Sequence, residues 1–226
     1  MSDARDVFVT GGTGYLGRPL VAALLARGHR VRALVREGSE GRLPAGAEPV
    51  LGDALRGETF AGRVAPSDTI VQLVGVAHPG PGKAALFRSV DLASAVASID
   101  AAKAARVSHF VYLSVAQPAP VMKAFVAARA EAEAHLAASG LPATILRPWY
   151  VLGPGHRWPY LILPLTWLLA RLPKTRETAR RLGFVTRRQM VDALVAAVES
   201  SASGIRVVTV PEIRAAATRP ASASGS

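Results

Sequence analysis

The chain of 226 residues contains no cysteine. This absence excludes disulfide bonds, zinc sites built from thiolates and a cysteine nucleophile. Acidic residues are also few, because 16 Asp and Glu stand against 27 Lys and Arg, a formal net charge of +11. Such an excess favours anionic partners. Nucleic acid is disfavoured among them, since no signature of a nucleic-acid-binding module accompanies the charge.

Long apolar runs are missing as well. The longest, Trp158 to Leu172, has 15 residues and contains Pro159 and Pro164, whereas a membrane span needs roughly 20 apolar residues. The segment of the first six residues is short and polar, unlike a signal peptide. We therefore expect a cytoplasmic protein.

Short β-branched runs alternate with longer segments rich in alanine and leucine. The runs are almost continuously apolar, as in strands buried on both faces of a parallel sheet. They are residues 6–10, 30–35, 48–52, 69–74, 109–114 and 143–147. Between them, apolar residues at three- and four-residue spacing predict helices near 15–27, 84–105 and 121–139. This order predicts an α/β fold with a doubly wound parallel sheet, the Rossmann arrangement.

The last third of the chain departs from this alternation, because prolines and aromatic residues interrupt it. We expect residues 1–147 to form the main domain and residues 148–214 a small cap on the C-terminal edge of the sheet. Within this cap, the pattern predicts a helix near 187–200 and a strand at 205–210. The remaining stretch, 215–226, is expected to be disordered.

A glycine-rich turn follows the first predicted strand directly. Gly11, Gly14 and Gly17 have the spacing G-x-x-G-x-x-G and lead into an amphipathic helix. The first glycine permits the tight turn, the second lets the backbone approach a diphosphate, and the third lets the helix pack close to the strand. The helix N-terminus then faces the phosphates. The turn predicts a dinucleotide site; the alternative is a glycine turn without a ligand.

The end of the second predicted strand bears on the choice of dinucleotide. A site that prefers NAD places an acidic side chain there, which binds the ribose hydroxyls. Here Arg32 and Arg36 occupy the region, and Glu37 comes one residue late. Arg36 could pair with the 2′-phosphate of NADP in a bidentate way. We expect NADP, with NAD as the second choice; the alternative is that Arg36 is a solvated surface residue.

Several segments resemble the atypical short-chain dehydrogenase/reductase family. They are TGGTGYLG, LVR at the end of the second strand, GDA after the third, and FVYLS followed by LRPWYVLGPG. Within the family, the chain looks most like the group that contains the nucleotide-binding accessory subunit of respiratory complex I. The resemblance implies these contacts: Gly11, Thr13, Gly14, Tyr15, Leu16 and Gly17 at the diphosphate, Arg36 at the adenosine ribose, Asp53 at the adenine edge, and Val74, Gly75, Val76 and Ala77 at the ribose bridge.

Active members of this family use a Tyr-x-x-x-Lys pair and a serine near the end of the fifth strand. The tyrosine supplies a proton and the lysine lowers its pKa. In this sequence Phe125 falls at the tyrosine position, Arg129 at the lysine position and Ala116 at the serine position, which leaves Ser114 at the strand end. Phenylalanine has no proton to give, whereas Arg129 can still hold a ribose, and Ser114 is placed with it among the cofactor-binding residues.

Other side chains could supply the proton, because their segments are expected to border the nicotinamide end. Tyr150 and Lys123 are the catalytic candidates, and His156 is a third residue of this kind. Each has a structural alternative: Tyr150 as a packing aromatic, Lys123 as a solvated charge at a helix start, and His156 as a surface-loop residue. No metal site is predicted.

Residues 158–188 combine an apolar stretch with a dense basic run. Between 171 and 188 there are seven basic residues and one acidic residue, so +6 of the total charge lies there. Such a segment could lie on an anionic membrane or dock on an acidic partner. The alternative is a substrate-side helix with a solvated charged face.

The sequence leaves two functions open. The first is an NADP-dependent reductase, dehydrogenase or epimerase acting on a small carbonyl or quinone-like substrate. The second is a non-catalytic NADP(H)-binding sensor or accessory protein, whose bound dinucleotide stabilises its fold. Peripheral attachment to a membrane is compatible with both, and the sequence predicts no oligomeric state.

Overall fold

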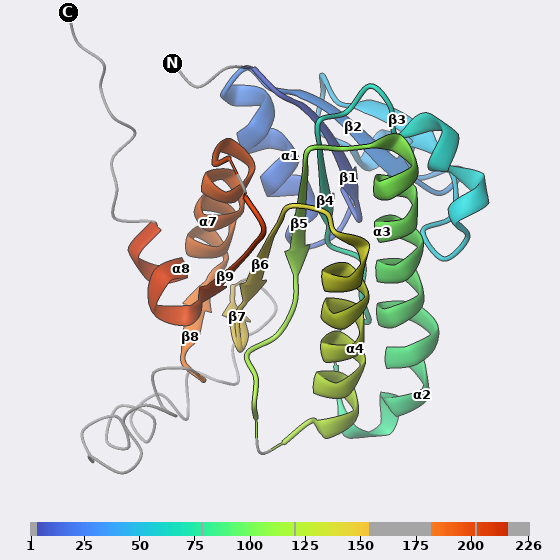
Figure 1. Ribbon diagram of the computed structural model, residues 1–226. Helices are drawn as coiled ribbons and strands as arrows, with labels where there is room; N and C mark the ends of the chain where they lie inside the picture. Colours follow the sequence, from blue (N-terminus) through green and yellow to red (C-terminus); the bar gives the residue numbers. More distant parts are fainter. Residues whose placement is uncertain (1–3, 78, 120, 154–181, 202, 217–226) are drawn as a thin grey trace, which may run out of the picture.

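The computed structural model describes residues 4–77, 79–119, 121–153, 182–201 and 203–216. Within them, seven parallel strands form one sheet in the order β3-β2-β1-β4-β5-β6-β9 (Figure 1). The strands are β1 (Asp6–Thr10), β2 (Arg30–Val35), β3 (Glu48–Leu51), β4 (Thr69–Gln72), β5 (His109–Leu113), β6 (Ala143–Arg147) and β9 (Ile205–Thr209). This arrangement confirms the predicted doubly wound α/β fold.

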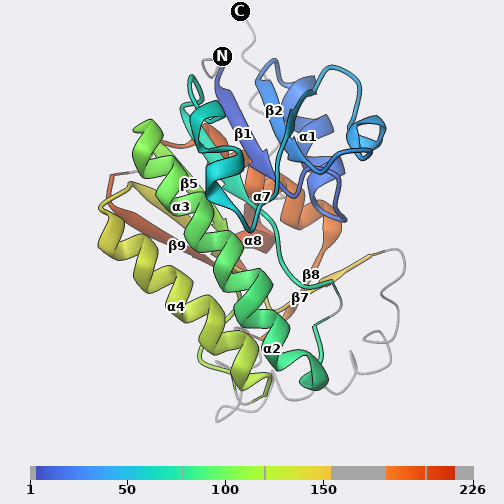
Figure 2. The same ribbon diagram turned by 90° about the vertical axis from the view of Figure 1, so that its right-hand side faces the viewer.

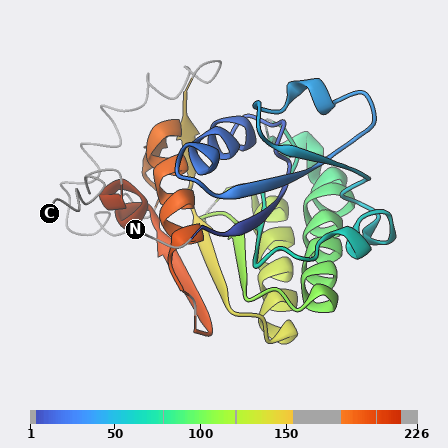
Figure 3. The same cartoon turned by 90° about the horizontal axis from the view of Figure 1, so that it is seen from above.

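Helices cover both faces of the sheet. The α-helices are α1 (Gly17–Ala26), α2 (Ala84–Leu86), α3 (Ala93–Ala105), α4 (Lys123–Ser139), α7 (Arg187–Glu199) and α8 (Val210–Ala216). Short 3-10 helices are η1 (Glu40–Arg42), η2 (Gly57–Thr59), η3 (Ala61–Arg63) and η4 (Pro81–Lys83), and a π-helical turn, η5 (Phe87–Leu92), joins α2 to α3. Figure 2 shows α3 and α4 side by side on one face. Figure 3 shows α1 and α7 packed together on the other.

The two hydrophobic clusters follow from the alternation of side chains along the strands. Val7 and Val9 of β1 join the cluster that contains α1 and α7. Phe8, between them, points to the opposite face and joins the cluster that contains α3 and α4. All three side chains are buried. The apolar run of β1 therefore reflects a strand covered on both faces, as predicted.

Two elements of the cap expected for residues 148–214 belong to the main sheet, and residues 154–181 of that range lie outside the described residues. Its predicted strand is β9, which pairs in parallel with β6 as the seventh strand of the main sheet. Its predicted helix is α7, whose buried side chains belong to the same cluster as β1. The apolar side chains of β9 and α7 are buried because β9 extends the central sheet and α7 joins the helix layer on one of its faces. The main domain therefore does not end at residue 147.

The structure also describes a second, smaller sheet of two strands. It pairs β7 (Tyr150–Leu152) with β8 (Phe184–Thr186) in parallel. The tail predicted to be disordered, 215–226, begins inside α8, and its residues 217–226 lie outside the described part of the chain. Across the described residues, no helix is long and apolar enough to cross a membrane.

Candidate functional site

The candidate site lies where the order of the sheet reverses. From β1 the sheet continues to β2 and β3 on one side and to β4 and β5 on the other. Open α/β sheets bind ligands at such a reversal, outside the carboxyl ends of the strands. Gly11 directly follows β1 and has a φ of +78°. A β-carbon there would lie 3.2 Å from the backbone nitrogen of Val74, which follows β4. The glycine turn and the predicted ribose-bridge segment, Val74 to Ala77, therefore border the same crevice.

The geometry of the turn explains its other glycines. The N–H of Gly14 donates to the carbonyl of Gly11 at 3.0 Å. A β-carbon on Gly17 would overlap that same carbonyl oxygen and would lie 2.7 Å from Cα of Gly12. Only glycine lets α1 start this close to the end of β1. Thr13 is half-buried and Tyr15 is more exposed.

The N-terminus of α1 is left without a cap from the protein. Leu16 is the N-cap residue and its side chain accepts no hydrogen bond, and the first turn of α1 contains no acidic residue. In α1 the N–H of Arg18 donates to the carbonyl of Gly14 at 3.1 Å, and Pro19 has no N–H. The N–H of Gly17 at the helix start, together with the helix dipole, is therefore what can attract an anion. Gly17 brings this helix start against the backbone of Gly11 and Gly12, and a diphosphate beside the turn suits this arrangement.

The two arginines of β2 differ in their surroundings. Arg32 is held by the protein, because its guanidinium donates to the carbonyl of Arg63 at 2.7 Å and to Oγ of Ser67 at 2.8 Å. Arg32 is therefore a structural residue. Arg36 follows the end of β2 and is exposed. The predicted contact of Arg36 with the adenosine ribose stays a prediction.

Asp53 lies one strand further along the same edge of the sheet, after β3. Its Oδ1 accepts a hydrogen bond from the N–H of Leu55 at 3.0 Å, and its own N–H donates to Oγ1 of Thr59 at 2.9 Å. These bonds shape the turn after β3. The half-buried carboxylate thus stands at the edge where an adenine ring is predicted to lie.

Arg129 lies beside the ribose-bridge segment, but the protein already holds both terminal nitrogens of its guanidinium. One donates to Oδ1 of Asp91 at 2.5 Å and the other to the carbonyl of Leu113 at 2.6 Å. A β-carbon on Gly75 would overlap this guanidinium, so Gly75 makes room for it. The predicted contact of Arg129 with a ribose would therefore compete with these bonds.

Asp91 joins three elements of the site and was not identified by the sequence pattern. Its Oδ2 accepts a hydrogen bond from the N–H of Val76 at 3.0 Å, while its Oδ1 binds Arg129. The side chain is fully buried within the π-helical turn η5. The signal available in the sequence is a single carboxylate inside an apolar helical stretch. Such a residue is buried only with a cationic or hydrogen-bonding partner.

The charge of Arg129 is maintained by its surroundings. Burial alone would lower the pKa of Arg129, but the nearby oxygens of Tyr112 and Asp91 outweigh this effect and raise the pKa. Burial raises the pKa of Tyr112, and the charge of Arg129 offsets the rise only in part. At neutral pH, Arg129 is therefore charged and Tyr112 is protonated.

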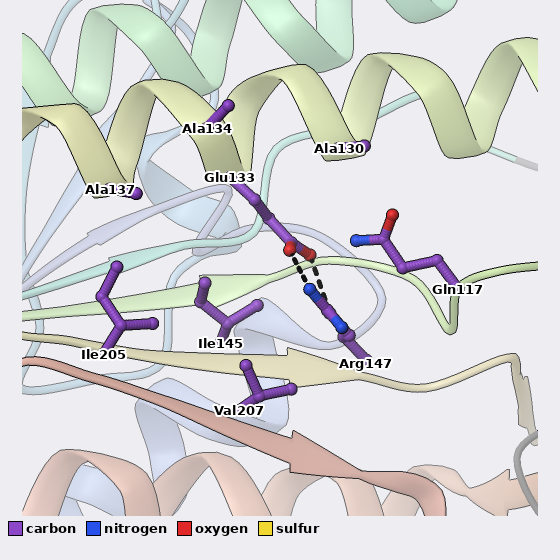
Figure 4. Close-up of a pocket in the computed structure, with 9 residues that line it drawn as sticks. All are labelled: Gln117, Ala130, Glu133, Ala134, Ala137, Ile145, Arg147, Ile205 and Val207. Atoms are coloured by element: carbon purple, nitrogen blue, oxygen red, sulfur yellow. Dashed lines mark hydrogen bonds and ion pairs between the residues drawn. The ribbon is translucent and has the colours of Figure 1, made fainter.

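Ser114 directly follows β5 and is hydrogen-bonded to a second buried acid. Its Oγ donates to Oε1 of Glu133 at 2.5 Å, and Nε of Arg147 donates to the same oxygen at 3.1 Å. Glu133 and Arg147 line a cavity of about 390 Å³ between α4, β6 and β9 (Figure 4). Figure 4 shows Glu133 reaching from α4 to Arg147 at the end of β6. Ser114 is thus held from the α4 side of the sheet.

Comparisons with known proteins agree with this geometry. A family model described as NAD(P)H-binding matches residues 11–163. The chain belongs to this family. It is an atypical short-chain dehydrogenase/reductase with a Rossmann fold, and its cofactor is a nicotinamide dinucleotide.

Two curated relatives of this short-chain dehydrogenase/reductase are reductases. The 3-diazoavenalumate denitrifying reductase of a Streptomyces species is 33% identical over 233 residues, which cover 91% of this chain and 76% of the relative. A 4-hydroxy-2-methyl-3-oxo-4-farnesyl-3,4-dihydroquinoline-1-oxide ketoreductase of Stigmatella aurantiaca is 38% identical over 109 residues, 47% of this chain and 32% of the relative. The match to the second relative thus covers about a third of that protein.

Solved structures show the same fold at lower identity. The Bordetella bronchiseptica enzyme WbmH in complex with NAD+ superposes with a TM-score of 0.69 at 20% identity and covers 92% of this chain and 76% of that one. The closer resemblance to the complex I accessory subunit stays a prediction.

The acid–base positions of the short-chain dehydrogenase/reductase are occupied by residues that pack. Phe125 lies in α4 with its ring centre 5.1 Å from that of Phe87 in η5. The guanidinium of Arg129 lies over the Phe125 ring at 5.4 Å. Ala116, at the predicted serine position, is buried, and its N–H donates to the carbonyl of Pro148 at 2.9 Å. None of these three side chains carries a titratable proton at neutral pH.

The two catalytic candidates come from different elements. Tyr150 begins β7, is half-buried, and packs edge-on against Phe184 of β8 with ring centres 6.0 Å apart. Lys123 is the first residue of α4 and is exposed. His156 lies outside the described residues. Residues 158–181 of the basic segment 158–188 also lie outside them, so its contact with an anionic membrane or acidic partner stays a prediction. Among the described residues, no cluster of side chains could hold a metal ion.

Proposed function

We propose that the protein is an NADP-dependent reductase that transfers a hydride to a small carbonyl or quinone-like substrate. The observation that carries this proposal is the uncapped N-terminus of α1, reached through a turn in which Gly17 has no room for a β-carbon. The bound dinucleotide supplies the hydride. The relative that aligns with 91% of this chain is a reductase, which supports the direction of the reaction.

Tyr150 is proposed as the proton donor to the reduced substrate. Its position supports this role, because Gly153, three residues later, lies against Tyr15 of the glycine turn. The end of β7 therefore lies at the glycine turn, and Tyr150 lies at the other end of this three-residue strand. Tyr150 is half-buried, so a substrate can reach it. Phe125, in the usual tyrosine position, has no proton to donate.

A turnover assay with matched variants tests this function. We expect purified protein to oxidise NADPH in the presence of a quinone or an aldehyde from a small panel. Tyr150→Phe should lower kcat by roughly a hundredfold, the usual size of a general-acid contribution. Lys123→Ala is the comparison for the second candidate, and the exposed position of Lys123 predicts a small effect. The absorbance of NADPH reports the rate.

Two results would contradict the assignment in different ways. Full activity of Tyr150→Phe would show that the proton comes from another group. Absence of turnover on every substrate, with NADPH still bound, would leave the non-catalytic function. That second candidate is favoured by the packing of Phe125 on Phe87 and by the engagement of Arg129 with Asp91.

The preference for NADP is assigned to Arg36. Arg36→Ala should weaken the binding of NADPH by roughly tenfold or more, because a charge-assisted pair with the 2′-phosphate is lost. NADH binding should change little, since NADH lacks this phosphate. Calorimetric titration measures both affinities. The matched control is Arg30→Ala, an exposed arginine at the opposite end of the same strand. Equal losses for NADPH and NADH would refute the assignment.

A further inference from the structure

Arg187 lies against the glycine turn although it comes from the distant end of the chain. Its guanidinium carbon is 5.4 Å from the centre of the Tyr15 ring. Gly153, after β7, completes the contact: a β-carbon there would lie 3.1 Å from Cζ of Tyr15 and 3.3 Å from Cβ of Arg187. The glycine turn, the end of β7 and the start of α7 therefore meet at one point.

The charge of Arg187 has no carboxylate within ion-pair distance in the part of the protein that the structure describes. Its neighbour Arg188 differs, because it lies 3.8 Å from Asp192 one turn along α7 and is almost fully exposed. Arg187 is half-buried. A guanidinium partly removed from water needs acceptors for its N–H groups, and a negative charge is the best of them.

The helix that Arg187 begins does not account for it. Thr186 caps α7 through a capping box, in which its Oγ1 accepts from the N–H of Gln189 at 3.1 Å and its N–H donates to Oε1 of Gln189 at 2.8 Å. No acidic residue follows in the first turn. A cation at a helix N-terminus opposes the helix dipole. The positive charge of Arg187 therefore does not stabilise α7.

We propose that Arg187 is a further dinucleotide-binding residue, which contacts the diphosphate of the cofactor beside the Tyr15 ring. The inference rests on the proposed function, since it requires a dinucleotide at the glycine turn. The planar guanidinium suits phosphate oxygens, which it binds in a bidentate way. The diphosphate is common to both dinucleotides. Arg187 therefore contributes to the affinity for NADPH and NADH alike, whereas Arg36 acts on NADPH alone.

Titration of both dinucleotides into matched variants tests this inference. Arg187→Met keeps the length and apolar stem of the side chain but removes its charge. We expect it to raise the Kd of NADPH and of NADH by the same factor, roughly ten- to hundredfold. Arg188→Met, the same change one residue later, should leave both values within about twofold of the wild type, because exposed ion pairs contribute little.

The possible outcomes separate this inference from the proposed function. Unchanged Kd values in folded Arg187→Met overturn the inference and leave the function intact, whereas a wild-type protein that binds neither dinucleotide overturns both. Thermal unfolding without ligand shows whether the variant is folded. If it is not, Arg187→Lys takes its place, because it keeps the charge but loses the planar fork. It should still weaken both dinucleotides, and unchanged Kd values there overturn the inference as well.

Discussion

Gly17→Ala is expected to abolish measurable dinucleotide binding and to lower the free energy of unfolding by about 2 kcal/mol. The added methyl group would overlap the carbonyl oxygen of Gly11 and lie 2.7 Å from Cα of Gly12. Both are backbone atoms, so no side chain can rotate away. The start of α1 must instead move from the end of β1, and the N–H groups of the turn move with it.

The control for this experiment is Gly62→Ala in η3. A β-carbon at Gly62 meets no atom within 4 Å, and the residue lies outside the glycine turn. Its effect on stability should stay within about 0.5 kcal/mol. Urea unfolding measures stability and calorimetry measures binding. If Gly17→Ala bound NADPH as tightly as the wild type, the turn would not be the diphosphate site.

The second large effect is expected for Asp91→Ala, which should lower the free energy of unfolding by about 3–5 kcal/mol. The substitution leaves the guanidinium of Arg129 buried without its carboxylate and removes the acceptor of the Val76 N–H. A buried charge that loses its partner keeps the full cost of its removal from water. Urea unfolding at neutral pH measures the loss.

An exposed ion pair provides the comparison for Asp91. Glu131, also paired with an arginine, binds Arg88 at 2.8 Å, but both side chains are at least half exposed. Glu131→Ala should therefore lower stability by less than about 1 kcal/mol. Similar losses for the two variants would mean that burial does not set the value of the pair at Asp91. The segment after β4 would then be held by other contacts.

Much of the fold can be predicted from local patterns, because each pattern reports a local physical requirement. Strands β1, β2 and β6 have the predicted bounds, and β3, β4 and β5 end one or two residues earlier than predicted. Their continuous apolar runs arise because both faces of the sheet are covered. The glycine turn is equally local, since the steric limit at Gly17 involves the turn's own backbone.

The position of β9 could not be predicted in this way. Its apolar pattern identifies a strand but names no neighbour, because parallel strands are joined by long connections rather than by a turn that sets the pairing. The pairing with β6 depends on the whole surface that β9 and α7 bury together. The structure therefore assigns the predicted strand of the cap to the main sheet, as its last strand.

The roles of single residues also fall into two groups: those that the local sequence predicts and those that depend on distant partners. Local order along the chain is enough to predict a diphosphate turn and the loss of the usual tyrosine, because these depend on residue type at a fixed spacing. The roles of Arg32, Arg129 and Arg187 depend on partners far away in the chain: Ser67, Asp91 and Tyr15. Three arginines look alike in a sequence, and only folding decides which oxygen or ring each one meets.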